Sequence, residues 1–450
     1  MEIQTDVVIN SKFWAATAIL IFTYILIISE KVNKTIVSIF GASLMIMLHL
    51  VDQKEAFYVE ELGVDWNVIF LLISMMIIIN IMKPTGFFEY IAIKSAKFGK
   101  GDPIKIMLTF AMVTAVLSAF LDNVTTVLLI APVSLLIADA LEISPIPFLI
   151  VEALASNIGG TATLIGDPPN IMIGSKAKLG FVDFLLHLTP VVLIAMFVFL
   201  LIVKLIFKTK LKISDDKKQR ILSMDESKAI KDPVLLSKSL FVLGLVLSGF
   251  VLHGILHYEP ATIALFGAGL LLLLAGIHDP HHIFSEIEWS TIFFFIGLFI
   301  IIGGVVKVGL IKLISVKILE ITNGNLMATS MLIIWFSAFA SAFIDNIPYV
   351  ATMNPLIINM AAQLWPDEKG LALLHHPELL PLWWSLALGA CLGGNGTMIG
   401  ASANVIVVGI ANKAGEKITF LRFLKYGMPT MVLTVIVSSV YIYIRYYLLK

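Results

Sequence analysis

Long apolar blocks recur along the chain, each about as long as the roughly 20 residues that a helix needs to cross the hydrocarbon core of a bilayer. Hydrophobic residues make up 59% of the 450 residues and charged residues 14%, against roughly a quarter charged in soluble chains. This pattern predicts an all-α polytopic membrane protein surrounded by lipid. With 31 basic and 31 acidic residues the net charge is zero, which argues against nucleic acid as a partner, because that binding depends on many basic contacts to phosphate.

About ten membrane spans are predicted, five in each half of the chain. They lie at about 13–29, 35–51, 68–82, 147–173 and 184–207, and again at about 240–253, 262–276, 292–306, 382–410 and 423–447. A charged linker at 208–235 is too polar for lipid. It separates a first half, 1–207, from a second half, 236–450.

The two halves carry the same motifs in the same order. At one constant offset Trp66 aligns with Trp289, and the pair Asp122-Asn123 aligns with the pair Asp345-Asn346. Further on, GGTATLIGDPPN at 159–170 aligns with GGNGTMIGASAN at 393–404, and six of the twelve positions are identical. Composition alone does not place such motifs in one order twice, so the chain contains an internal repeat.

Each half also has an apolar region with an Asp-Asn pair at its centre, at 104–140 and at 330–363. A lipid-facing helix does not accept such a pair, so both regions are predicted to be re-entrant helical hairpins with Asp-Asn at the tip. Five spans per half is an odd number. The two repeats are therefore expected to be inverted relative to one another.

Basic residues are unevenly distributed between the predicted loops. Those on the same side as the linker collect more of them, including Lys31, Lys34, Lys94, Lys97 and Lys100. The positive-inside rule then places the linker in the cytoplasm and both termini outside, in the inner (plasma) membrane of the cell.

Glycine and proline interrupt two of the predicted spans, 147–173 and 382–410. Both residue types weaken a helix, so each span is expected to unwind at its centre. Broken helices bind substrates in secondary transporters, because half-helix N-termini attract anions while freed carbonyls, Asn and Thr coordinate cations. The alternative is that the small residues only permit close helix packing. Two breaks at matching places, each following a tip, favour the binding interpretation.

The candidate substrate- and ion-binding residues are the polar groups of the tips and breaks, together with one glycine. They are Asp122, Asn123, Thr125, Thr126, Asn157, Gly160, Thr161, Thr163, Asp167, Asn170, Asp345, Asn346, Asn395, Thr397, Ser402 and Asn404.

Four carboxylates in apolar surroundings are candidates for proton coupling: Asp122, Glu152, Asp167 and Asp345. Burial disfavours a charged carboxylate, so each is a candidate proton carrier or cation ligand. Asp122 and Asp345 could instead serve only as caps of the helices that follow them. Asp167 aligns with Ala401, so the two half-sites are not chemically equivalent.

Other polar or reactive residues are given structural interpretations. His278, His281 and His282 lie in a short loop without accompanying cysteines, which favours a solvated turn over a metal site. Cys391 is interpreted as a packed small residue. Neither a metal nor a cofactor is expected; a proton or sodium gradient would drive transport.

The motifs FLDNVTT, GGTATLIGDPPN, FIDNIPYVATM and GGNGTMIGASAN resemble those of the ArsB/NhaD branch of the ion transporter superfamily, which includes the melanosomal P protein. The resemblance covers nearly the whole chain. It implies a scaffold domain and a transport domain that moves like an elevator, with two hairpins that meet two broken helices. It also implies a homodimer and allows an energising ATPase as a further partner.

The resemblance leaves the substrate open. Arsenite or antimonite efflux by antiport with protons is slightly favoured, and sodium-proton antiport is the close alternative. A sodium-coupled carboxylate symporter is less favoured, because the aspartates at the tips stand where the distant divalent anion symporters hold a carboxylate with Ser-Asn-Thr. An ion channel would need a continuous polar lining. An enzyme is not expected, since no nucleophile with a nearby base appears within the spans.

Overall fold

The regular secondary structure is entirely helical in the part of the chain that the computed structural model describes, residues 7–29, 31–59, 61–207, 214–277 and 279–449. Nine helices in these residues are long and apolar enough to cross a membrane. They are α1 (Ser11–Ser29), α4 (Trp66–Met82), α6 (Pro103–Phe120), α7 (Asn123–Leu141), α11 (Thr189–Phe207), α13 (Pro233–Leu256), α16 (Trp289–Lys307), α18 (Leu326–Phe343) and α23 (Phe420–Tyr443).

The predicted spans and the observed helices correspond, but they are divided differently. Six spans are the single long helices α1, α4, α11, α13, α16 and α23, whereas α2 (Lys34–Met47) and α14 (Pro260–Ala275) are shorter apolar helices. The other long helices, α6, α7 and α18, belong to the two regions predicted to be hairpins. These helices are long enough to cross a membrane. Their length therefore does not decide between a re-entrant hairpin and two full crossings, and the re-entrant course stays a prediction.

Both glycine-rich spans are interrupted, as their glycines and prolines predict. The first consists of α8 (Ile146–Gly160) and α9 (Pro168–Ala177) with a non-helical segment between them. The second consists of α21 (Leu380–Gly393), a short 3-10 turn η3 (Gly394–Gly396) and α22 (Ser402–Lys413). Each helix therefore ends and starts again in the middle of the protein.

Each Asp-Asn pair lies at a sharp turn between two helices. α6 leads to α7 through Asp122, whose carboxylate accepts a hydrogen bond of 2.8 Å from the backbone N–H of Thr125. α18 leads to α19 (Asn346–Leu364) through Asp345, which accepts one of 3.1 Å from the N–H of Ile347. Both aspartates thus cap the second helix of their pair, which is compatible with a further role.

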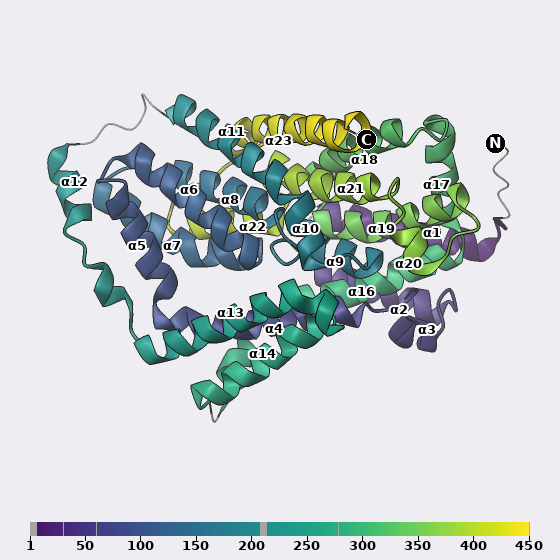
Figure 1. Cartoon of the computed structure of the whole chain (residues 1–450), viewed down its shortest axis with the longest axis horizontal. Coiled ribbons are helices and arrows are strands. Elements are labelled where there is room, and N and C mark those ends of the chain that lie inside the picture. The colour runs from purple at the N-terminus through teal and green to yellow at the C-terminus, as the bar shows by residue number, and fades with distance from the viewer. Residues whose placement is uncertain (1–6, 30, 60, 208–213, 278, 450) are drawn as a thin grey trace.

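The two repeats interlock around these elements. Within each repeat the first hairpin helix packs on the first half of the broken helix, α6 on α8 and α18 on α21. Between repeats, α9 packs on α19, α22 on α7, α2 on α16 and α4 on α14. Figure 1 shows α4, α13 and α14 along the lower edge of the molecule and α11 and α23 along the upper edge, with the broken helices between them. Any site at the breaks is consequently built from both repeats.

Shorter helices connect these elements. α5 (Phe87–Phe98) and α17 (Leu310–Ile321) each follow a glycine in the left-handed region, Gly86 with φ 82° and Gly309 with φ 87°. The others are α3 (Gln53–Tyr58), η1 (Lys83–Thr85), α10 (Phe181–His187), α12 (Asp215–Leu222), η2 (Glu226–Ala229), α15 (His281–Ser285), α20 (Gly370–Leu374) and η4 (Ile444–Leu448).

The linker runs along the helices of the first repeat. Lys97 of α5 pairs with Glu226 of η2 at 2.5 Å, and Arg220 of α12 pairs with Glu142 after α7 at 2.9 Å. Residues 208–213 of the predicted linker and His278 lie outside the described residues. The exposed His281 and His282 open the short helix α15, so they lie at the surface as expected of a solvated segment.

Candidate functional site

Both hairpin tips and the first break meet at Asp167. The side-chain amide of Asn123, at the first tip, donates a hydrogen bond of 3.1 Å to Asp167 Oδ1. The amide of Asn346, at the second tip, donates one of 3.4 Å to the same oxygen. All three side chains are buried, and Asp167 is the residue that immediately precedes α9. One carboxylate therefore connects elements that are far apart in the sequence.

A chain of asparagines extends the site to the second break. Asn123 also donates to Asn157 Oδ1 at 3.1 Å. Asn157 in turn donates to Asn395 Oδ1 at 2.9 Å and to Asn404 Oδ1 at 3.0 Å. The network is fully buried, and such satisfied polar networks hold their members in one arrangement.

Two equivalent asparagines hold the unwound segments in place. Asn170 donates to the carbonyls of Thr161 at 3.1 Å and Thr163 at 2.8 Å. Its counterpart Asn404 donates to the carbonyls of Gly394 at 2.8 Å and Thr397 at 2.9 Å. The acceptors Thr163 and Thr397 align, whereas the other acceptor differs by one position, so the two breaks have similar internal clamps.

Hydroxyls fasten each hairpin to its own broken helix. Thr163 donates to the carbonyl of Ala119, and Thr397 donates to that of Ala342, the position aligned with Ala119. Thr125 donates to the Asp122 carboxylate and Thr126 to the Asp122 carbonyl, within the tip itself. These threonines were predicted as binding residues, and in this arrangement their hydroxyls hold the backbone of the site.

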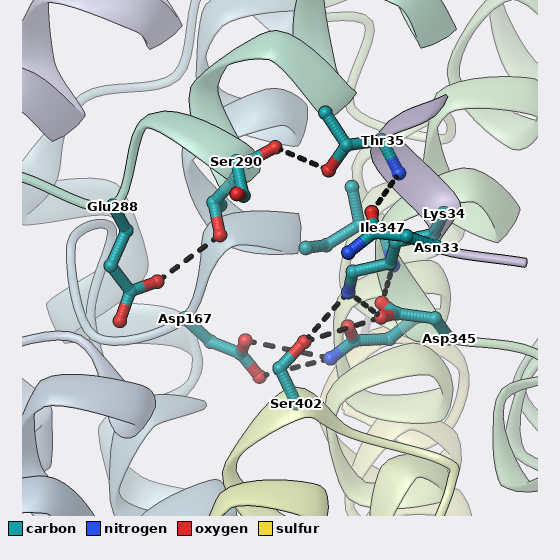
Figure 2. Close-up of polar contacts among 11 residues, drawn as sticks. Asn33, Lys34, Thr35, Asp167, Glu288, Ser290, Asp345, Ile347 and Ser402 are labelled. Atoms are coloured by element: carbon teal, nitrogen blue, oxygen red, sulfur yellow. Dashed lines mark hydrogen bonds and ion pairs between the residues drawn. The ribbon is translucent and has the colours of Figure 1, made fainter. Parts of the chain in front are cut away.

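The second tip carries an ion pair, whereas Asp122 at the first tip has none within the described part of the chain. Lys34 Nζ lies 2.6 Å from Asp345 Oδ2 and 3.0 Å from Ser402 Oγ, the residue that begins α22. Figure 2 shows the lysine reaching these two groups from the start of α2. In the sequence, Lys34 is one of several basic residues of a predicted loop, and nothing there indicates this contact.

Glu288 is a second site residue absent from the sequence predictions. It immediately precedes α16, and its carboxylate accepts a hydrogen bond of 3.1 Å from Thr291 Oγ1. Figure 2 places Glu288 across from Asp167. Two features of the sequence could have identified Glu288. It stands just before an apolar span, and the constant offset of the repeat aligns it with Asp65.

Two neighbouring cavities adjoin this cluster. The smaller has a volume of about 20 Å³, is lined by both tips and includes Asp167. That is enough for about one water-sized particle. The larger has a volume of about 430 Å³ and is lined by Lys34 among others. Glu288, Thr291 and Ser402 line both cavities, so the two cavities share a wall.

Glu152 lies apart from these cavities, among the described residues that line neither of them. Its Oε1 accepts a hydrogen bond from Ser134, and its Oε2 has no hydrogen-bond partner within the described part of the protein. An uncompensated charge on this carboxylate would cost several kcal/mol, and Glu152 lies outside both cavities through which a cation could reach it.

Replacing Glu152 by Gln is therefore expected to leave transport by the purified protein unchanged. The amide retains an acceptor for Ser134 and has nearly the volume of the acid. Initial rates in proteoliposomes, measured across the pH range, test this. A displaced pH profile would restore Glu152 as a proton carrier.

Cys391 is buried, and its thiol donates to Asn170 Oδ1 at 3.4 Å. By the alignment of the two breaks it occupies the position of Asn157, so a thiol replaces an amide in the second half-site. Cys391 was expected to be only a packed small residue, but its thiol also contacts the central network of asparagines.

Two hairpin tips that meet two broken helices in an apolar chain of many helices define a multi-pass secondary transporter. A family model described as citrate transporter, CitMHS, matches residues 24–389. The chain belongs to this family of the ion transporter superfamily, and so it is a transporter and not an enzyme.

Relatives match over almost the full length of the chain. An uncharacterized transporter of Mycobacterium tuberculosis is 44% identical over 96% of this chain and 99% of its own length, and a 46 kDa membrane protein of Mycobacterium leprae is 42% identical over 96% and 98%. Human P protein is 33% identical over 97% of this chain and 60% of its own length, so the expected likeness to P protein is confirmed. The YdaH transporter of Alcanivorax borkumensis shares the fold, with a TM-score of 0.57, 13% identity and 96% of each chain covered.

Proposed function

We propose that the protein exchanges sodium for protons at Asp167. The observation that carries this proposal is the convergence of both tip asparagines on one buried carboxylate beside a cavity of about 20 Å³. Carboxylate and amide oxygens are ligands that hard cations prefer. A space of this size suits a small ion that has shed most of its water.

The charges around the site favour a cation over an anion. Asp122, Asp167 and Glu288 line the smaller cavity, and Asp345 adjoins the larger one. Among the described residues that line either cavity, Lys34 is the one lysine or arginine. A tricarboxylate such as citrate, which the family description names, would bring further negative charge to this cluster and exceeds the volume of the smaller cavity.

Competition at Asp167 supplies the coupling. A buried carboxylate is strongly disfavoured while it is charged and without a cation, so it is stable either protonated or with a bound cation. In the structure the tip asparagines donate to its oxygens and hold the carboxylate in place. Binding of one ion then requires release of the other, and an exchange follows without a separate proton pathway.

Arsenite or antimonite efflux by proton antiport is the second candidate, and the sequence favours it slightly. The observation on its side is Cys391, whose thiol lies beside Asn170 in the central network. Thiols are soft ligands, which suits trivalent arsenic better than sodium. The compact, acidic smaller cavity instead favours sodium-proton exchange over arsenite efflux.

The surrounding architecture is part of the proposal. α1, α2, α4, α13, α14 and α16 would form a scaffold, and the hairpins and broken helices would form the domain that moves as an elevator. We place the protein in the inner (plasma) membrane as a homodimer, with the linker in the cytoplasm and both termini outside. The positive-inside distribution supports this orientation.

Purified protein in liposomes distinguishes the two candidates. A pH gradient is imposed, and proton movement is followed after addition of NaCl, choline chloride, arsenite or citrate. We expect proton movement with sodium and none with choline or citrate. Arsenite uptake with no response to sodium would replace the first candidate by the second, and no response to any of the four would reject both.

Asp122→Asn and Asp345→Asn should each lower the exchange rate about tenfold, an effect of about 1.4 kcal/mol. Asparagine caps helices as well as aspartate does, so the fold should remain intact while the charge is lost. Folding is checked by size-exclusion chromatography and thermal unfolding. Unchanged rates in both variants would reduce the two aspartates to helix caps.

A further inference from the structure

We propose that Lys34 is a coupling residue: it neutralises the second tip when no transported cation is bound and is displaced when a cation enters. This inference rests on the proposed cation-proton exchange and assigns a role to a residue outside the Asp167 centre. The amino group supplies from within the protein the positive charge that the transported ion supplies in the loaded state.

Lys34 contacts the second tip directly. Its Nζ lies 2.6 Å from Asp345 Oδ2 and 3.0 Å from Ser402 Oγ, and Ser402 Oγ donates to the same carboxylate oxygen at 3.2 Å. The ammonium also lies 4.9 Å from the ring centroid of Phe294, a favourable cation-π position. The Asp345 side chain is 11% exposed and that of Lys34 31%, so the pair is shielded yet reachable from the larger cavity.

The stem of Lys34 is fixed to a different group of helices from its head. Asn33 caps α2 by accepting from the N–H of Thr35 at 2.9 Å. Thr35 Oγ1 donates to the carbonyl of Ser290 in α16 at 2.7 Å. Figure 2 shows these two hydrogen bonds beside the ion pair of Lys34 and Asp345. A displacement of the second tip relative to α2 and α16 must therefore break the bond between Lys34 and Asp345.

Lys34 also lines the cavity next to the Asp167 centre, and we take that cavity as the entry route of the cation. Lys34, Asp345 and Ser402 line the larger cavity, and Ser402 lines the smaller one as well. A cation that enters from the larger cavity reaches the ammonium before it reaches Asp167. Glu288 lines both cavities and is the other carboxylate of the larger one, to which a displaced ammonium can turn.

Charge balance turns this placement into coupling. If Lys34 leaves while no cation is bound, Asp345 remains as a shielded carboxylate without its ionic partner, which is strongly unfavourable. Separation of the tip from α2 is then favourable only when the transported cation or a proton has taken over the role of Lys34. A static brace between two helices would show no such dependence on the ion.

Transport kinetics in proteoliposomes test the proposal with Lys34→Met, Lys34→Arg and the control Lys31→Met. Lys31 lies in the same loop and is exposed. For Lys34→Met we expect the KM for sodium to fall about tenfold, because the internal competitor is gone, and the maximal rate to fall about tenfold, because the unloaded tip stays charged. Lys34→Arg should restore most of the rate, and Lys31→Met should match the wild type. An unchanged KM in Lys34→Met would overturn the inference.

A second measurement needs no transport. Thermal unfolding of the wild type, Lys34→Met, Asp345→Asn and the double variant gives the coupling energy of the pair, first in choline chloride and then in NaCl at equal ionic strength. We expect coupling in choline and a clear reduction in sodium. Equal coupling in both salts would reject displacement of Lys34 even if the protein exchanges sodium. Absence of sodium-proton exchange by the wild type would instead reject the proposed function.

Discussion

Asp167→Asn is expected to reduce sodium-proton exchange to the level of liposomes without protein, while the protein remains folded. The carboxylate accepts hydrogen bonds from Asn123 and Asn346 and lines the smaller cavity. Asparagine retains one oxygen for these donors, so the tips stay in place. It can neither release a proton nor offer a charge to a cation, and both halves of the exchange are lost.

Glu152→Gln is the matched control, since it also replaces a fully buried carboxyl group by an amide but lies beside Ser134, outside both cavities. Exchange rates and thermal unfolding are measured for both variants. If Asp167→Asn retains exchange with an unaltered pH profile, Asp167 is a structural hydrogen-bond acceptor. If both variants lose exchange together with their thermal stability, the effect belongs to folding.

Gly159→Ala is expected to lower the free energy of unfolding by about 1–3 kcal/mol, the usual cost of overfilling a packed interior. A Cβ at Gly159 would overlap the backbone of Ala115 in α6, including its carbonyl oxygen. Backbone cannot turn aside as a flexible side chain does, so α6 and α8 would have to separate. Thermal unfolding of the detergent-purified protein measures the loss.

Gly409→Ala provides the control for this substitution. Gly409 lies within α22, and a Cβ there would meet nothing within 4 Å. Alanine is the better helix former by about 1 kcal/mol, so this variant should be as stable as the wild type or more stable. A stable Gly159→Ala protein would show that the glycine is not needed for the close approach of the two helices.

The resemblance to the transporter family predicted that the two hairpins meet the two broken helices, and the repeat predicted that matching motifs fold alike. Asn123 and Asn346 align with each other, and both reach Asp167. The breaks, too, follow from local chemistry, since glycine and proline end helices wherever they occur. Asp167 and Ala401 align, so the difference between the half-sites was also visible in advance.

Contacts between distant, unrelated segments could not be predicted in this way. Lys34 and Asp345 are 311 residues apart, and no motif links them. A lysine at the start of an apolar segment is ordinarily a solvated helix end, so only the packing of α2 near the second tip reveals its partner. The same holds for Glu288, which belongs to the site because of where α16 begins.

Side-chain direction was the other missing information. Thr163 and Thr397 lie in the breaks, yet their hydroxyls bind hairpin carbonyls. The surroundings of Glu152 are apolar, as predicted, but its carboxyl group has Ser134 of α7 as a hydrogen-bond partner. Residue type and position within a predicted span therefore identified the polar groups. The structure shows which of them lie beside the cavities and which hold the backbone.

Proton release on sodium binding tests the central claim most directly. Purified protein in weakly buffered detergent solution near neutral pH is mixed with NaCl or with choline chloride, and the change in pH is recorded. Competition at Asp167 predicts that sodium releases protons, that choline releases none, and that Asp167→Asn responds to neither salt. Sodium binding without proton release, or equal release from Asp167→Asn, would contradict exchange at this carboxylate.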